Sequence, residues 1–313
     1  MARVNVEMVK KVAATIKNLS LEVRALDFTE EDKFPAVGDP GALDYFFAVT
    51  MHDYGFWIGD ERGYVNPLSG VIDQKILKGS DLLWTLSMKI YRESGPEFFN
   101  PRNLAELELK DFCRWIPEKY GFQDIVTRHN MTVEYGKYCV HKNINTKHLV
   151  TIANYSESSL QSFIRLTSSM PGYNKDDLFK KNLLLAMISA NRPEKFLKVR
   201  SEEKWPPIVD YHVMRVALRL GLIELSLIEY DQLARRVYVD YWTEAQIRKA
   251  TFDAIEMVIL LSGKPMSEID FLLWSARRYC PEMTKPDCSK CCFDDVCKKR
   301  IQLFQPILRT TNY

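Results

Sequence analysis

The sequence predicts a mainly α-helical protein with a small β element near its N-terminus. Beyond residue 95, apolar residues recur every three to four positions in one segment after another, which is the spacing of amphipathic helices. Strand-like patterns occur only nearer the N-terminus, and prolines and glycines separate the periodic segments. With 313 residues, 46% of them apolar and 27% charged, the chain has the composition of a soluble globular protein with a sizeable core.

The N-terminal part combines helices with the β element. Residues 3–19 have apolar side chains at helical spacing, and the densely aromatic residues 42–58 are expected to begin as helix and end as strand. The remaining predictions for this part are a turn at 59–63, a short strand at 64–72 and a helix at 80–92.

Helices dominate the rest of the chain. The region 122–150 has weaker periodicity and is expected to hold loop or strand. The predicted helices span residues 103–118, 157–169, 175–190, 208–220, 229–236, 243–261 and 266–279.

Composition excludes several classes of protein. A net charge of only +2 gives no large basic field of the kind that attracts nucleic acid. The seven cysteines are an odd number, and five of them lie within residues 280–297, whereas a disulfide framework would spread them along the chain. The N-terminus lacks the apolar core of a signal peptide, and the longest apolar stretches are too short to span a bilayer. We therefore expect a soluble, cytoplasmic protein without a membrane partner.

Four cysteines near the C-terminus form the most informative motif. Cys280, Cys288, Cys291 and Cys297 have the spacing C-x7-C-x2-C-x5-C, which lets short loops aim four thiolates at one centre. A tetrahedral zinc and an iron–sulfur cluster both use such a ligand set. The alternative is a group of reduced, unliganded thiols, and the close spacing favours a metal centre.

The segment around Asp210 is the second motif. Pro206 and Pro207 fix an extended entry, and the residues after them have helical periodicity, so Asp210 is expected at or near a helix N-terminus. There the backbone N–H groups and the helix dipole keep a carboxylate ionised. Taken alone, this pattern is also that of a simple N-cap residue.

These two motifs together resemble the helix–hairpin–helix DNA glycosylases typified by endonuclease III. The segment Pro-Pro-Ile-Val-Asp-Tyr-His-Val-Met-Arg-Val at 206–216 is similar to their aspartate segment, and the cysteine array is similar to their cluster loop, with one extra residue in its first interval. The resemblance implies a 4Fe–4S cluster on the four cysteines, with Cys292 spare and structural zinc as the alternative. The family's glycine-rich hairpin has no good match, since residues 170–174 lack its second glycine, and a nucleophilic lysine after it is unsupported.

A second resemblance covers most of the chain and is to the queuosine salvage N-glycosylases. Their segments look like residues 53–57, 209–214, 216–221, 244–248, 270–274 and 306–309 followed by Tyr313, in that order. The chain departs from their pattern at Asp53, His212 and Met214, where they have asparagine, arginine and proline. This resemblance implies a two-part helical fold of the DNA-glycosylase type and cleavage of a base–ribose bond.

Such a reaction requires a carboxylate near the anomeric carbon and a pocket for the base. Asp210 is the predicted catalytic residue, because a fixed carboxylate stabilises positive charge on the sugar and orients water. Aromatic side chains would stack on the base, carboxylates would accept its N–H groups, and basic side chains such as Lys181 would hold a phosphate. Each aromatic residue can equally be core, and each arginine an ion-pair partner. The predicted substrate-binding residues are His52, Asp53, Tyr54, Phe56, Trp57, Tyr211, His212, Arg248, Asp270, Trp274 and Arg309.

The sequence thus predicts an N-glycosidase that releases a modified, queuosine-type purine base from a nucleotide or nucleoside. The alternative is a monofunctional DNA glycosylase of base excision repair, with nucleic acid as the partner in place of a small molecule, and a binding module without activity is the third class. Three parts are expected along the chain. Residues 1–150 would supply pocket aromatics, 151–265 the catalytic aspartate, and 266–313 the cluster loop.

Overall fold

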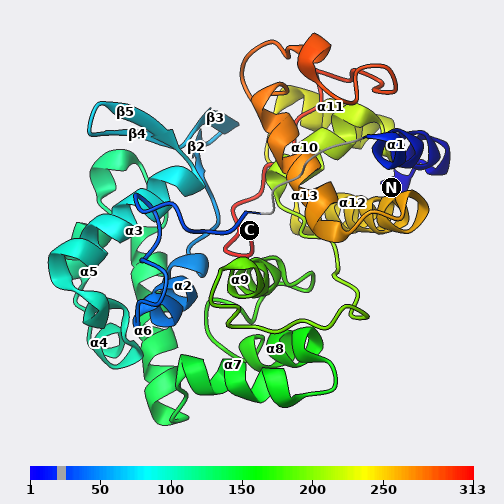
Figure 1. Ribbon diagram of the computed structural model, residues 1–313. Helices are drawn as coiled ribbons and strands as arrows, with labels where there is room; N and C mark the ends of the chain where they lie inside the picture. Colours follow the sequence, from blue (N-terminus) through cyan, green and yellow to red (C-terminus); the bar gives the residue numbers. More distant parts are fainter. Residues whose placement is uncertain (20–25) are drawn as a thin grey trace. The chain divides into compact units, whose positions relative to one another are not determined.

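The computed structural model describes residues 1–19 and 26–313 and confirms a mainly α-helical protein (Figure 1). The described residues form two compact units, each assembled from separate stretches of sequence. Unit 1 contains the described residues before 20 together with 59–66 and 205–309, and unit 2 contains 26–58, 67–204 and 310–313. The predicted division into residues 1–150, 151–265 and 266–313 assigned the pocket aromatics, the catalytic aspartate and the cysteine loop to separate segments. That assignment stays a prediction.

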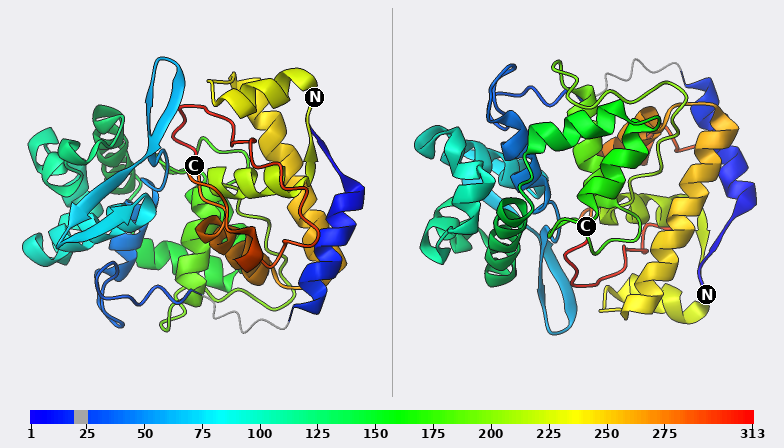
Figure 2. Two further views of the ribbon diagram at one scale, coloured as in Figure 1. Left: turned by 90° about the horizontal axis from the view of Figure 1, so that it is seen from above. Right: turned by 90° about the horizontal axis from the view of Figure 1, so that it is seen from below.

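Two contacts in unit 1, one between helices and one between short strands, join segments that are distant in sequence. Helix α1 (Val6–Asn18) buries one apolar stripe and packs along α12 (Tyr241–Ser262), as Figures 1 and 2 show. Strand β1 (Arg3–Val4) pairs antiparallel with β6 (Ile223–Glu224). The other helices of this unit are α10 (Tyr211–Leu220), α11 (Leu227–Arg235) and α13 (Met266–Ser275).

Helix α10 is the central element of unit 1. Residues 205–210 are extended up to Asp210, as the two prolines require, and the helix ends at Gly221, whose φ of +88° suits a residue without a side chain. Every residue of α10 except His212 is buried, and the helix contacts α12 and α13. Two of the buried residues are Arg215 and Arg219, so the helix carries charges that need partners inside the unit.

Unit 2 contains the aromatic core. In α2 (Ala42–Thr50) all residues but Asp44 are buried, which explains the dense apolar run. The hairpin of β4 (Ser69–Ile72) with β5 (Lys75–Lys78) lies in this unit, whereas residues 59–66 of the hairpin of β2 (Trp57–Asp60) with β3 (Gly63–Pro67) belong to unit 1. The two hairpins confirm the small β element. The remaining helices are α3 (Ser80–Ser94), α4 (Pro101–Ala105), α5 (Leu109–Trp115), α6 (Ile125–His141), α7 (Thr146–Tyr155), α8 (Ser159–Thr167) and α9 (Lys180–Asn191).

The expectation of loop or strand at 122–150 is wrong, because this region holds α6 and most of α7. The buried side of α6 includes Arg128, Thr132 and Gly136, so its inward face does not stand out by hydropathy. Gly136 marks a close approach to α4, since a Cβ there would lie 2.3 Å from the backbone nitrogen of Ala105. The predicted helix 103–118 is likewise divided into α4 and α5.

None of the helices in the described part of the chain combines the length and apolar character that crossing a bilayer requires.

Candidate functional site

Asp210 is the N-cap residue of α10. Its Oδ1 accepts a hydrogen bond of 2.8 Å from the backbone N–H of Val213, and its backbone is extended at φ −108° and ψ −177°. The carboxylate is half-buried and lies at the positive end of the helix dipole. Buried Arg248 of α12 donates from Nε to the carbonyl oxygen of Val209 at 3.2 Å, which fixes the backbone immediately before the aspartate.

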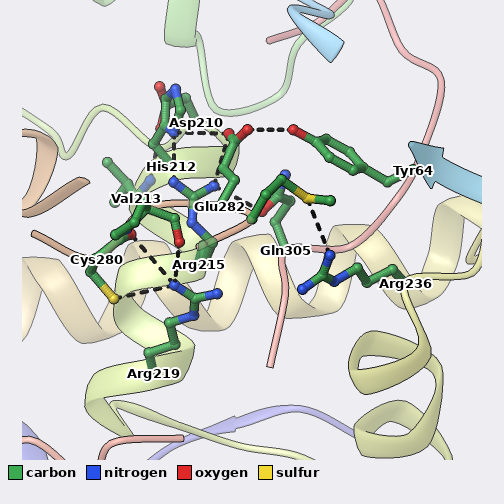
Figure 3. Close-up of polar contacts among 12 residues, drawn as sticks. Tyr64, Asp210, His212, Val213, Arg215, Arg219, Arg236, Cys280, Glu282 and Gln305 are labelled. Atoms are coloured by element: carbon green, nitrogen blue, oxygen red, sulfur yellow. Dashed lines mark hydrogen bonds and ion pairs between the residues drawn. The ribbon is translucent and has the colours of Figure 1, made fainter. Parts of the chain in front are cut away.

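A buried polar network lies one turn further along α10 (Figure 3). The Arg215 guanidinium donates from Nη1 to Glu282 Oε1 at 3.1 Å and to Gln305 Oε1 at 2.9 Å, and from Nη2 to His212 Nδ1 at 2.9 Å. Tyr64 donates its hydroxyl hydrogen to the other carboxylate oxygen of Glu282. Glu282 comes from the interval between the first two cysteines of the array, so the cysteine loop contributes directly to this network.

The two tyrosines beside Glu282 stay protonated. Burial raises the pKa of Tyr64 far above its usual value, and the neighbouring Glu282 carboxylate raises it further. Burial also raises the pKa of Tyr211 well above the ordinary range, with the charges of Glu282 and Asp210 acting in the same direction. Both phenols therefore stay neutral, and the Tyr64 hydroxyl donates to Glu282.

The cysteine loop is attached to the C-terminal end of α10. Arg219 donates from Nη1 to Cys280 Sγ at 3.2 Å and to the carbonyl of Pro281 at 2.8 Å. The backbone N–H groups of Lys298 and Arg300 donate to the carbonyls of Leu220 and Arg219, each at 3.2 Å. These bonds satisfy carbonyl groups that the end of a helix leaves without partners.

The four predicted cysteine ligands are close enough for their charges to interact. Burial raises the pKa of Cys297, and so do the nearby thiols of Cys280, Cys291 and Cys288. All four are half-buried, whereas Cys292 is exposed. Cys297 Sγ also accepts the backbone N–H of Lys299 at 3.2 Å, a bond that would stabilise a thiolate. In the described ranges, no three His, Cys, Asp or Glu side chains are placed so that they could hold one metal ion, so the metal centre stays a prediction from the cysteine spacing.

The other predicted residues of unit 1 are placed as follows. Tyr211 is buried at the start of α10, and Asp270 and Trp274 are half-buried on α13. The Arg277 guanidinium lies 3.6 Å from the Trp274 ring centroid, so one face of this ring already carries a cation. Arg309 is exposed and donates from Nε to the Tyr238 hydroxyl at 3.2 Å.

The predicted residues of unit 2 form a second group. Asp53 is buried and paired with Lys180 of α9, whose Nζ also donates to the Asp53 carbonyl at 2.7 Å. Tyr54 is covered by the Arg128 guanidinium at 3.8 Å from its ring centroid. Phe56 and Trp57 are buried within the same unit. Stacking of these three rings on a base stays a prediction.

His52 occupies a core position. The side chain is fully buried, its Nε2 lies 2.9 Å from Thr132 Oγ1, and its ring meets Phe112 and Trp115 edge to face. Burial and the nearby Arg128 cation lower its pKa well below the usual value, so the imidazole is neutral. This environment favours a packing role over the predicted contact with a substrate.

Lys181 of α9 lines a cavity of about 280 Å³ within unit 2. Its buried Nζ donates to the carbonyls of Met51 at 3.1 Å and Thr311 at 2.8 Å. Burial lowers its pKa to about 7, and the neighbouring cation of Lys180 adds to this effect. Other residues of the cavity wall are Asn130, Glu134, Asn174, Lys175, Asp176 and Asn312.

Sequence reasoning missed Glu282, Arg215 and Tyr64. Arg215 follows His212 at the i, i+3 spacing that brings two helical side chains together, so their contact could have been predicted from the sequence. Glu282 and Tyr64 have no such signal, because only the folded loop brings them to α10.

No protein-family model matches the chain, and no curated protein is similar enough to count as a match.

Proposed function

We propose that this protein is an N-glycosidase that hydrolyses the base–ribose bond of a modified, queuosine-type purine nucleotide or nucleoside. The observation that carries the proposal is the Asp210 carboxylate, held at the N-terminus of a buried helix by the N–H of Val213 and by the Arg248-anchored backbone before it. The ordered resemblance along the chain supplies the substrate class.

The reaction needs one carboxylate and one water molecule. As the C–N bond breaks, its electron pair leaves with the base, and positive charge develops on the sugar. In the proposed mechanism, Asp210 stabilises this charge and accepts a proton from water, whose oxygen bonds to the anomeric carbon. The proton that Asp210 takes from water then passes to the departing base nitrogen, so the carboxylate is regenerated and the products are the free base and a ribose or ribose phosphate.

The cysteine array is proposed to hold a 4Fe–4S cluster, with structural zinc as the alternative. Cys280, Cys288, Cys291 and Cys297 would bind it, and Arg219 and the N–H of Lys299 would offset the negative charge of the thiolates. When bound, such a group supplies a cross-link that fixes the loop against α10.

Base release from queuosine 5′-monophosphate, measured by chromatography with purified protein, tests this function. Asp210→Asn keeps a side-chain oxygen for capping and is expected to lower the rate by about 10²- to 10⁴-fold. Asp240→Asn is the matched control, because Asp240 caps α12 through a 2.7 Å bond from Thr243 N–H and has no proposed role in the reaction. Equal loss in both variants would show that Asp210 is only an N-cap.

The alternative function, a monofunctional DNA glycosylase, is favoured by the cysteine array and the aspartate segment together. Duplexes carrying common base lesions form the second arm of the same experiment. Base release from DNA but not from the nucleotide would replace the proposed substrate class, whereas release from neither would favour a binding module.

A further inference from the structure

His212 Nδ1 has two neighbours that make opposite demands. Arg215 Nη2 lies 2.9 Å away, and a guanidinium nitrogen can only donate, so this contact requires Nδ1 to accept. Glu282 Oε1 lies 3.5 Å from the same nitrogen and can only accept, so it would require a proton on Nδ1. The shorter contact decides, and the neutral ring then carries its proton on Nε2.

Arg215 is held firmly in this arrangement. Its side chain has no exposed surface, and Nη1 is bonded to both Glu282 and Gln305. The guanidinium carbon also lies 5.8 Å from the centroid of the Phe304 ring. Glu282 is fixed in turn by the Tyr64 hydroxyl, so Arg215 cannot leave His212 without disrupting several buried hydrogen bonds.

We propose that Arg215 and Glu282 are positioning residues that hold His212 as the tautomer protonated on Nε2. In this tautomer Nδ1 is the acceptor and Nε2 the donor of the ring. The partner of Nε2 must therefore be an acceptor, and in a substrate this is a carbonyl oxygen or an unprotonated ring nitrogen of the base. This last step rests on the proposed function, whereas the tautomer does not.

The tautomer is measured directly by two-bond ¹H–¹⁵N NMR spectra of the full-length protein labelled with ¹⁵N-histidine, recorded near neutral pH. His212→Gln identifies the signals, since the chain has five histidines. A neutral ring with Nε2 protonated is the expected result. A ring protonated on Nδ1 alone, or on both nitrogens, would overturn the inference.

Two variants test the role of the pair. The double variant Arg215→Met with Glu282→Leu removes both members of the ion pair, so no unpaired charge stays buried. Arg215→Lys retains the positive charge beside Glu282 but lacks the forked donors. In the double variant His212 is expected to populate both tautomers, and in Arg215→Lys, where Glu282 still lies beside Nδ1, the tautomer protonated on Nδ1 is expected to gain population. A single Nε2-protonated tautomer in either folded variant would show that the pair does not set it.

Arg236→Met is the matched control. Arg236 also lies over Phe304, with 4.8 Å from its guanidinium carbon to the ring centroid, but it bonds Met283 rather than His212. Its variant should keep the wild-type histidine spectrum, and a changed tautomer there would point to general loosening of the loop. Because these spectra involve no turnover, the inference and the proposed function can fail separately.

Discussion

Replacing Lys181 with methionine should change how the stability of the protein depends on pH. The lysine is buried beside a cavity, with carbonyl oxygens as its hydrogen-bond partners, and burial lowers its pKa from 10.5 to about 7. Methionine fills a similar volume and does not titrate. The comparison therefore isolates the free energy of placing this ammonium group in the folded protein.

The size of the effect follows from the gap between the two pKa values. The gap corresponds to about 5 kcal/mol, at 1.36 kcal/mol for each pH unit. Between pH 7 and 10.5 the unfolded chain binds a proton that the folded chain does not, so the wild-type free energy of unfolding rises with pH in this window. Below pH 7 both states carry the proton, and the full cost of burying the charge is present.

Urea unfolding of wild type and Lys181→Met at pH 7.5 and 9.5 provides the measurement. Relative to the variant, the wild type should gain about 2.5 kcal/mol between these two pH values. Lys175→Met is the control for removal of a lysine from the same cavity wall, because Lys175 is exposed rather than buried.

A stability difference between wild type and Lys181→Met that stays constant from pH 7.5 to 9.5 would refute the reasoning. The pKa of Lys181 in the folded protein would then be close to that of an exposed lysine. This would require a carboxylate near Nζ that offsets the cost of burying the charge, because carbonyl contacts alone do not offset it.

Three further predictions concern packing and the cysteines. Gly136→Ala should destabilise the protein by about 1–3 kcal/mol, measured by thermal unfolding, because the new methyl group would meet the backbone of α4; an unchanged Tm would mean that α4 and α6 are less tightly packed. Phe293→Ala should cost about 3–5 kcal/mol, because this fully buried ring anchors the cysteine loop, and a loss below 1 kcal/mol would contradict that role. Cys288→Ser should abolish bound iron and its visible absorbance, whereas Cys292→Ser should retain both; zinc without iron in the wild type would favour the alternative centre.

The sequence allowed most helices to be predicted, because apolar periodicity records which face of a helix is buried. The N-terminus of α10 was predicted for a similar reason, since Pro206, Pro207 and Asp210 act locally and leave a local signal. Helix α6 was missed because Arg128 and Thr132 occupy its buried face. Their burial depends on hydrogen bonds to distant residues, such as those from Arg128 to the carbonyls of His52 and Tyr54, which a periodicity pattern does not contain.

In the candidate site, too, only residues with a local sequence signal could be predicted. Asp210 and the four cysteines stand in recognisable local contexts, and the structure places the cysteine loop on the helix that Asp210 caps. Glu282 was not predictable, because its importance arises from a contact with Arg215, 67 residues away in the sequence. Nothing in the composition of the loop distinguishes this glutamate from an exposed one.

The discontinuous make-up of the two units has a consequence for folding during synthesis. Unit 2 includes residues 310–313, where the Thr311 carbonyl accepts a bond from Lys181 and the Tyr313 carbonyl accepts one from Gly55. Unit 1 likewise joins α1 to α12, more than 200 residues later. During synthesis the N-terminus leaves the ribosome first. Neither unit can therefore form all its contacts before residues near 310 have emerged. Until these distant partners have emerged, the apolar stripe of α1 lacks its packing surface on α12 and is available to chaperones.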